Sequence, residues 1–596
     1  MDKLRQEART ALKEDRNTLP QTLSSSGEVA QQARVQDVWA DVSTFDHSTL
    51  ENMNESLYAA LQYFNGRLNS VPGGASRALA TEETEAVQKL LEWASEAALP
   101  SVEFEPIFND DPDIPDEVMK AQEGSRLKGY LATSLVAILA TKSTLDHDIT
   151  RSPRVIMALA CYTSDADPWT TDKAMQNAKA TLQLVGQDLP WKTIDEILKD
   201  KVRPLFKSSK NPSITSQGRK NFHPVPLSRF EGLSLDGSNN PWKNTDIYAT
   251  RVLSWIAHQY RKYESSDMEA HFPLLVPVIL ALIDDSNTTF KAKGCDILKQ
   301  ILEIISDNSS KTLIRMNLVS VFEEAITPCL LSLPTITPEK RSLELLSSAY
   351  PTLISLFKAG YPIPSRDQIP ANPALEETYM KNRNAYSRSV QKILRNNLIS
   401  SFHHISSSTP ASRETSASFP HPFLSTFLMH WIGVFIQELG FHAIMFLQEI
   451  VPVLYTTLSN PFGTAHPPLL TAAVSTTKQL ILNAHARIYR WRGEILGGLT
   501  SCYLHVIDEL DELETRKLKD DNPRDIFRKI QRDLKITAIA LKYTLENSAE
   551  IAAAQGVSVA DVEFIPKDTV EKEFQELIRA DPRLEQLLMV EKDSLV

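Results

Sequence analysis

Apolar residues recur every three or four positions over long stretches of the chain, and strict alternation of apolar and polar residues is confined to short runs. This spacing is typical of amphipathic helices. The stretch 271–305, HFPLLVPVILALIDDSNTTFKAKGCDILKQILEII, has one apolar face on each side of the polar turn DDSN. Asp, Ser and Asn side chains compete for backbone groups and favour turns and caps. The pattern predicts two antiparallel helices, with Thr288 or Thr289 capping the second.

A proline inside the first of these helices recurs with the same surroundings. Pro277, Pro328 and Pro452 each have an apolar residue two positions before and two positions after them, and a polar turn and a second helical pattern follow each. A chain of 596 residues is too long for one hydrophobic core, so several domains or a repeat structure are needed. We therefore interpret the chain as an all-α, degenerate HEAT/armadillo-like α-solenoid of antiparallel helix pairs.

The turn of the first pair also resembles the HEAT pattern. In that pattern an acidic turn residue and a basic residue early in the second helix bind each other across neighbouring turns. Asp284 or Asp285 would be the acid here, and Lys291 the base. The second and third copies lack the acid.

Composition divides the chain into four segments. We expect an N-terminal helical region, a long Gly/Pro-rich loop, the HEAT-like solenoid and a C-terminal helical cap, at 1–207, 208–244, 245–550 and 551–596 respectively. The first contains an acidic, proline-rich loop near 100–117. Residues 405–421 form an insertion in the solenoid that is poor in apolar side chains, and we expect it to be disordered.

The charge balance argues against a nucleic-acid partner. Acidic residues outnumber basic ones by 75 to 63, which gives a net charge of −12. Such a chain repels a phosphate backbone on average, so we expect no direct binding of nucleic acid. The most basic stretch, 201–220, is interpreted as a solvated loop rather than a nucleic-acid surface.

Cysteine usage and targeting signals bear on the compartment. The four cysteines lie far apart without a CxxC pair, which favours buried thiols in a reducing compartment. The first 20 residues carry acids throughout and resemble neither a secretory signal nor a transit peptide. The longest apolar run, 423–436, is shorter than the roughly 20 residues of a membrane span. We expect a cytoplasmic and nuclear protein that does not enter a membrane.

No constellation of residues predicts a catalytic, cofactor or metal site. Cys502 with His505, and His403 and His404 with His421, are the only metal-like groupings, and neither has a recognised spacing. The segment GEILGG, 493–498, lacks the features of a phosphate loop and is interpreted as a close contact between helices. We expect a protein that is not an enzyme.

Two short segments are candidates for binding another protein, because Trp and Arg are enriched at interface hot spots. The first contains Trp242 and Lys243, and the second contains Arg490, Trp491 and Arg492. The alternative interpretation is that both tryptophans anchor their loops on the solenoid.

Three stretches carry a resemblance to a known family: RPLFKSSKNPSITSQGRK at 203–220, PWKN at 241–244, and HFPLLVPVILALIDDSNTTFKAKGCDIL at 271–298. Together they resemble the Tti-two family, the second Tel-two-interacting proteins of the Triple-T complex, in a fungal form. The resemblance extends over about 200–500.

That resemblance implies a non-enzymatic HEAT scaffold. Its partners would be Tel-two-like and Tti-one-like proteins, two larger α-solenoids. The complex would act as a co-chaperone that stabilises and matures phosphatidylinositol-3-kinase-related kinases, which it receives from the ninety-kilodalton heat-shock chaperone system.

Two other functions compete with this one. A HEAT-repeat transport or trafficking adaptor that binds basic cargo or a small GTPase would suit the acidic composition, but it would need recurring acidic and Trp/Asn ladders that the sequence does not contain. An enzyme with its site in the 208–244 loop would depend on Arg219, Lys220 and His223.

Overall fold

The computed structural model describes thirteen stretches of the chain, and the statements below concern these residues alone. They are 2–14, 34–69, 83–105, 115–142, 145–187, 189–207, 211–215, 217–223, 240–363, 373–407, 420–515, 522–554 and 567–589. These stretches are helices joined by short connections, without a β-strand, and Ile214 and Lys220 form an isolated antiparallel bridge. The predicted all-α class is therefore confirmed.

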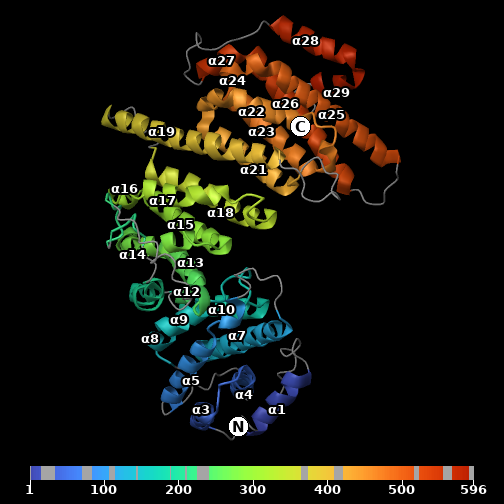
Figure 1. Ribbon diagram of the computed structural model, residues 1–596. Helices are drawn as coiled ribbons and strands as arrows, with labels where there is room; N and C mark the ends of the chain where they lie inside the picture. Colours follow the sequence, from blue (N-terminus) through green and yellow to red (C-terminus); the bar gives the residue numbers. More distant parts are fainter. Residues whose placement is uncertain are drawn as a thin grey trace. The chain divides into compact units, whose positions relative to one another are not determined.

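The chain forms two compact units, Met1–Phe322 and Glu323–Val596, divided within helix α17 (Val319–Ile326). The four segments expected from composition do not coincide with this division. The longest helix of the first unit, α7, packs against α4, α5 and α10 (Figure 1). The helices of this unit have the following bounds: α1 Asp2–Glu14, α3 Val35–Thr44, α4 Leu50–Asn69, α5 Thr84–Ala97, α7 Asp116–Lys142, α8 His147–Thr150, α9 Pro153–Ala160, α10 Asp172–Val185, α11 Trp191–Glu196, α12 Pro241–Asn244, α13 Ala249–Gln259, α14 Ser265–Ile283, α15 Thr288–Asp307 and α16 Thr312–Arg315.

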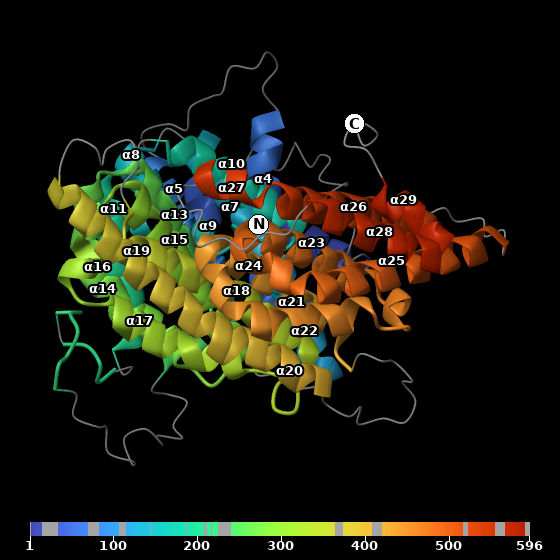
Figure 2. The ribbon, with the colours of Figure 1, turned by 90° about the horizontal axis from the view of Figure 1, so that it is seen from above.

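In the second unit, α23 packs between α21 and α26, and α25 packs on α22 and α26. Figures 1 and 2 both show α26 and α28 side by side. The helices of this unit have the following bounds: α18 Glu339–Gly360, α19 Pro373–Ile393, α20 Ser400–Ser407, α21 Pro422–Leu439, α22 Leu447–Leu458, α23 Pro467–Asn483, α24 His485–Ile488, α25 Arg492–Thr515, α26 Asn522–Glu546, α27 Ser548–Ala554, α28 Lys567–Ala580 and α29 Glu585–Leu588.

The helix pair predicted from 271–305 is present as α14 and α15. The two helices touch closely at Gly294, where an added Cβ would lie 2.8 Å from the Cβ of Leu282. The cap of α15 differs from the prediction. Asn287 is the N-cap, and its side chain accepts a hydrogen bond from the amide of Thr289 at 2.8 Å. Asn is among the strongest N-cap residues, and here it precedes the threonines.

The three anchor prolines have different settings. Pro277 and Pro452 lie inside α14 and α22, whereas Pro328 lies in a 3₁₀ turn, Thr327–Leu331, that follows the short helix α17. The predicted second helices of these pairs are α15, α18 and α23. The contact interpretation of 493–498 is confirmed as well, because an added Cβ on Gly497 would lie 3.1 Å from Tyr455 of α22.

Two apolar stretches, Ser265–Ile283 and Pro422–Leu458, are long enough to cross a membrane by length and composition. The second is longer than the run 423–436 because a 3₁₀ helix, Gly440–Phe446, joins α21 to α22. In the most apolar window of each stretch, 56% and 44% of the residues are buried inside the protein. Two such stretches are weak indicators of a membrane span, and the expected lack of one stays a prediction.

Several expectations fall wholly or partly outside the described residues. This is so for 106–114 of the acidic loop, for most of the loop at 208–244, and for 408–419 of the insertion expected to be disordered. Residues 405–407, at the start of that insertion, continue α20. The cysteine prediction is confirmed in structural terms, since all four are buried and none forms a disulfide.

Candidate functional site

The three stretches that carry the family resemblance come together around the α14–α15 turn. Asn211 donates from Nδ2 to Oδ2 of Asp284 at 2.6 Å, and the Lys243 ammonium lies 3.1 Å from Oδ1 of Asp285. Both turn aspartates are therefore held by segments far away in the sequence. We call this cluster, formed by Asn211, Trp242, Lys243, Asp284 and Asp285, the turn clasp.

The turn clasp corrects the expected HEAT ladder. Asp285 pairs with Lys243 rather than Lys291, and both partners are mostly buried. Burial raises the pKa of Asp284, and the hydrogen bond from Asn211 and the charge of Lys291 partly offset this effect. The two turn aspartates thus have Asn211 and Lys243 of α12 as their hydrogen-bonding and ion-pair partners, and Lys291 acts on Asp284 only through its charge.

Trp242 is a structural anchor of the clasp. Its side chain is 2% exposed and stacks on Phe206, with ring centroids 5.0 Å apart and planes at 12°. On another side it meets the ring of Phe290 edge-on, also at 5.0 Å. Pairs of this kind add about 0.5–1.5 kcal/mol beyond the area that they bury. The loop-anchor interpretation therefore describes Trp242, whose ring is covered in this structure.

The segment 211–223 is tied down on both sides. The amide of Lys220 donates to the carbonyl of Met316 at 3.1 Å, and its ammonium donates to Oγ of Ser320 at 2.7 Å. Gly218 has φ of +70°, and an added Cβ there would lie 2.6 Å from the carbonyl oxygen of Pro273. Only glycine combines this left-handed backbone with so close an approach.

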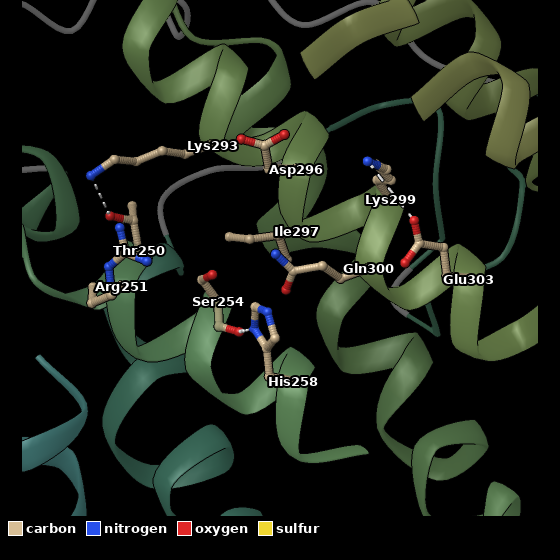
Figure 3. Close-up of a pocket in the computed structure, with 10 residues that line it drawn as sticks. All are labelled: Thr250, Arg251, Ser254, His258, Lys293, Asp296, Ile297, Lys299, Gln300 and Glu303. Carbon is tan, nitrogen blue, oxygen red and sulfur yellow. Dashed lines mark hydrogen bonds and ion pairs between the residues drawn. The ribbon is translucent and has the colours of Figure 1, made fainter. Parts of the chain in front are cut away.

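A groove of about 260 Å³ lies between α13 and α15 (Figure 3). Figure 3 shows Arg251 and Lys293 at one end, and Lys299 and Glu303 at the other. Next to Arg251 and Lys293 lies a buried carboxylate, that of Asp167, whose side chain is 1% exposed. Asp167 forms ion pairs with Arg251 and, at 3.1 Å, with Lys293.

This three-charge network joins the loop before α10 to both walls of the groove. The ammonium of Lys293 also lies 3.5 Å from Oγ1 of Thr250 and 5.8 Å from the ring centre of Trp169. Burial lowers the pKa of Lys293, while the charge of Asp167 opposes that effect. A buried charge is tolerated only when it is paired and hydrogen-bonded, and here the network links the loop before α10 to α13 and α15.

A second buried polar cluster surrounds His271 in the first half of α14. Nε2 of His271 lies 2.7 Å from Oδ1 of Asp195, and Nδ1 lies 3.1 Å from the hydroxyl of Tyr260. The imidazole stacks on Trp191 with a centroid distance of 4.2 Å. Burial lowers the pKa of His271, and the hydrogen bond to Asp195 acts in the opposite direction. The ring therefore donates from Nε2 to the carboxylate and accepts from the tyrosine as a neutral imidazole.

The comparison with protein families decides between the interpretations of this region. A profile of the Tti2 family matches residues 155–465. That match covers 311 of 596 residues, more than half of the chain, and includes the whole turn clasp.

The chain belongs to the Tti2 family. This is the Tti-two family of the sequence resemblance. Membership supports a general role as a co-chaperone subunit of the Triple-T complex, and the members of this family are non-catalytic subunits. A search of solved structures finds a crystal complex of SYS-1 with POP-1, with 11% identity over 89% of this chain and 88% of that chain. The TM-score is 0.29, a value at which the likeness bears on neither fold nor function.

The second candidate segment lies in the C-terminal unit of this Tti2-family chain. Arg492 forms a two-pronged ion pair with Glu573 of α28, with its shortest contact at 2.7 Å, and its guanidinium lies 5.4 Å from the ring centre of Tyr489. Arg492 thus joins α25 to α28. Arg490 is exposed and Trp491 is half-buried. Partner binding by this segment and by Trp242 and Lys243 stays a prediction.

The metal-like groupings of the sequence do not come together. Among the described residues, the structure has no group of three or more His, Cys, Asp or Glu side chains placed to hold a metal ion. Burial raises the pKa of Cys502 to about 12, so its thiol is protonated at neutral pH and is a poor nucleophile.

Sequence reasoning missed Asp167, Arg251 and Lys293, and it missed His271 with Asp195. The charged pairs Asp167–Arg251, Asp167–Lys293 and Asp195–His271 are 84, 126 and 76 positions apart along the chain, so no local spacing indicates them. One signal was available for each cluster. Lys293 and His271 both interrupt the apolar faces of α14 and α15, and a polar residue at a core position needs a buried partner.

Proposed function

We propose that this chain is a non-catalytic scaffold subunit of a Triple-T co-chaperone complex. It assembles with two larger α-solenoid proteins, Tel-two-like and Tti-one-like, and thereby stabilises and matures phosphatidylinositol-3-kinase-related kinases. The kinases and the chaperone machinery are reached indirectly, through the assembled complex. The work takes place in the cytoplasm and the nucleus.

The single observation that supports this proposal is the family match over 155–465, which contains the turn clasp. The clasp uses residues from three separated stretches to fix the α14–α15 turn. The clasp holds the α14–α15 turn in one conformation, so the helices around it present a defined surface. α-Solenoids ordinarily act by binding other chains through such surfaces.

The experiment is an affinity purification of the tagged full chain at moderate salt, followed by mass spectrometry of the proteins that accompany it. We expect two large α-solenoid proteins in near-equal amounts with the chain, together with traces of very large kinases. Recovery of a small GTPase with varied cargo would favour the transport adaptor, and recovery of nothing stable would contradict the scaffold proposal.

Incubation of the purified chain with ATP, divalent metal ions or nucleic acid tests the non-catalytic part of the same proposal. We expect no turnover of ATP and no retention of metal after dialysis. A bound nucleotide or metal that depends on Arg219 and His223 would contradict the proposal and support an enzymatic site in the 208–244 loop.

A further inference from the structure

A small basic hollow of about 420 Å³ lies between the segment 211–223 and the turn after α16. Three cations line it: Arg219 and Lys220 from the segment, and Arg315 from α16. Its lining contains no carboxylate among the residues that the structure describes. In a chain with a net charge of −12, such a concentration of positive charge is unusual.

Backbone contacts join the walls of the hollow to each other and to α14. The antiparallel bridge between Ile214 and Lys220 closes one wall, and the Lys220 amide is bonded to the carbonyl of Met316 in the other. Gly218 lies directly against Pro273 of α14. A preformed site binds more tightly than a floppy one, because less conformational entropy is lost on association.

The cations keep hydrogen-bonding capacity for a ligand. Arg315 is paired with Glu269 at 2.7 Å and Lys220 donates to Ser320, but a guanidinium has five N–H donors and an ammonium has three. Arg219 is exposed, and its side chain forms no ion pair with the described residues. The free N–H groups of these three cations can therefore donate hydrogen bonds to two or three carboxylates of a ligand.

An apolar ring adjoins these charges. Phe222 lines the hollow and is 67% exposed, which places a large apolar surface in water beside Arg219. Aromatic residues, Phe included, and Arg are enriched at protein interfaces relative to the rest of the surface, so the pair Phe222 and Arg219 suits contact with another protein.

The chemistry favours an acidic protein segment over a nucleic acid. The hollow is the size of a site for a few side chains, whereas a nucleic acid contacts a long run of cations, and the acidic remainder of the chain opposes a phosphate backbone. Among the described residues that line the hollow, Phe222 is the only aromatic one, and these residues offer no platform on which successive bases can stack.

We infer that this hollow binds an acidic segment of a partner protein, with carboxylates against Arg219, Lys220 and Arg315 and one apolar side chain on Phe222. The inference rests on the proposed function in one respect, namely that the segment belongs to a stable partner subunit. It revises the solvated-loop interpretation of the stretch 201–220.

The test measures binding of the full chain to a fluorescein-labelled peptide of glutamates and aspartates with one central leucine. Arg219→Glu and Phe222→Ala alter exposed side chains and are expected to fold normally. Lys201→Glu is the matched control, because it makes the same charge change at an exposed position of the same basic stretch, away from the hollow.

We expect Arg219→Glu to weaken peptide binding about tenfold or more, because the loss of one hydrogen bond between charged groups changes the dissociation constant by about that factor. Phe222→Ala weakens it by a smaller factor, Lys201→Glu leaves it unchanged, and added salt weakens it. Equal binding by Arg219→Glu and wild type overturns the inference. So does a single-stranded polyuridine RNA that binds more tightly than the peptide and depends on Arg219.

The purification experiment separates this inference from the proposed function. If wild type recovers no partner, the proposed function fails whatever the peptide does. If wild type and Arg219→Glu recover the two subunits equally and the peptide does not bind, the inference fails and the proposed function stands.

Discussion

The buried network around Asp167 makes a quantitative prediction about the N-terminal unit. Replacing Asp167 with alanine removes the one carboxylate between Arg251 and Lys293 and leaves two positive charges without their partner. Removal of one partner from a buried ion pair costs about 3–5 kcal/mol, chiefly because the remaining charge stays desolvated.

The structure places the expected cost near the lower end of that range. The side chain of Asp167 is 1% exposed, but those of Arg251 and Lys293 are 17% and 21% exposed and line the groove of Figure 3. Water in the groove can hydrate both cations in part. We expect a loss of about 3 kcal/mol, which at about 2 °C per kcal/mol corresponds to a fall of about 6 °C in Tm.

Tryptophan fluorescence during urea unfolding is a suitable assay, because six of the eight tryptophans lie in Met1–Phe322. Asp165→Ala is the matched control, since Asp165 is exposed in the same loop and the charge change is identical. We expect the control to stay within about 0.5 kcal/mol of wild type. A second substitution, Lys293→Met, should restore part of the loss by removing one of the two cations that Asp167 neutralises. If Asp167→Ala cost no more than Asp165→Ala, the argument that the network fixes this unit would be refuted.

Three further predictions concern the same unit. Burial lowers the pKa of His271, so the folded state resists protonation of this ring; its contribution to the free energy of unfolding is complete above the unfolded pKa of about 6.5 and is lost as pH falls below it. Between pH 7 and 5, the stability of His271→Gln should therefore depend less steeply on pH than that of wild type or of the exposed control His258→Gln, and equal slopes would contradict this reasoning. Gly294→Ala should lower the free energy of unfolding in urea by about 1–3 kcal/mol, because the new Cβ would lie 2.8 Å from the Cβ of Leu282 in α14. The control Gly493→Ala places its Cβ where nothing lies within 4 Å and should be neutral or slightly stabilising, so equal stabilities of the two variants would count against close packing of α14 on α15. Trp242→Ala should cost about 3–5 kcal/mol by removing a covered ring from between two phenylalanines, and a stable variant that loses only partner binding would restore the hot-spot interpretation.

The parts of the fold that were predictable are those that local patterns determine. The period of the apolar residues predicts α14 and α15, because each helix must bury one face whatever lies against it. Local patterns do not fix the first residue of a helix where several neighbouring residues can all cap it. Asn287, Thr288 and Thr289 can all cap a helix, and the first of them does so.

The candidate site was predictable only in part, for a physical reason. The sequence drew attention to the acidic turn, to PWKN and to the basic stretch, but it gave no means of joining Lys243 to Asp285 or Asn211 to Asp284. Those contacts join residues 42 and 73 positions apart. Long-range pairs depend on how helices pack, and apolar periodicity carries no information about the order of packing.

The measurement that tests the central claim most directly is the lifetime of newly made phosphatidylinositol-3-kinase-related kinases after rapid depletion of this chain. Pulse-labelled kinases would be followed by immunoprecipitation, with wild type and the Asp165→Ala variant as rescues. The co-chaperone account predicts that new kinase molecules decay faster after depletion, that their messenger RNA is unchanged, and that both rescues restore their lifetime. Unchanged kinase lifetimes in cells that lack the chain would contradict it.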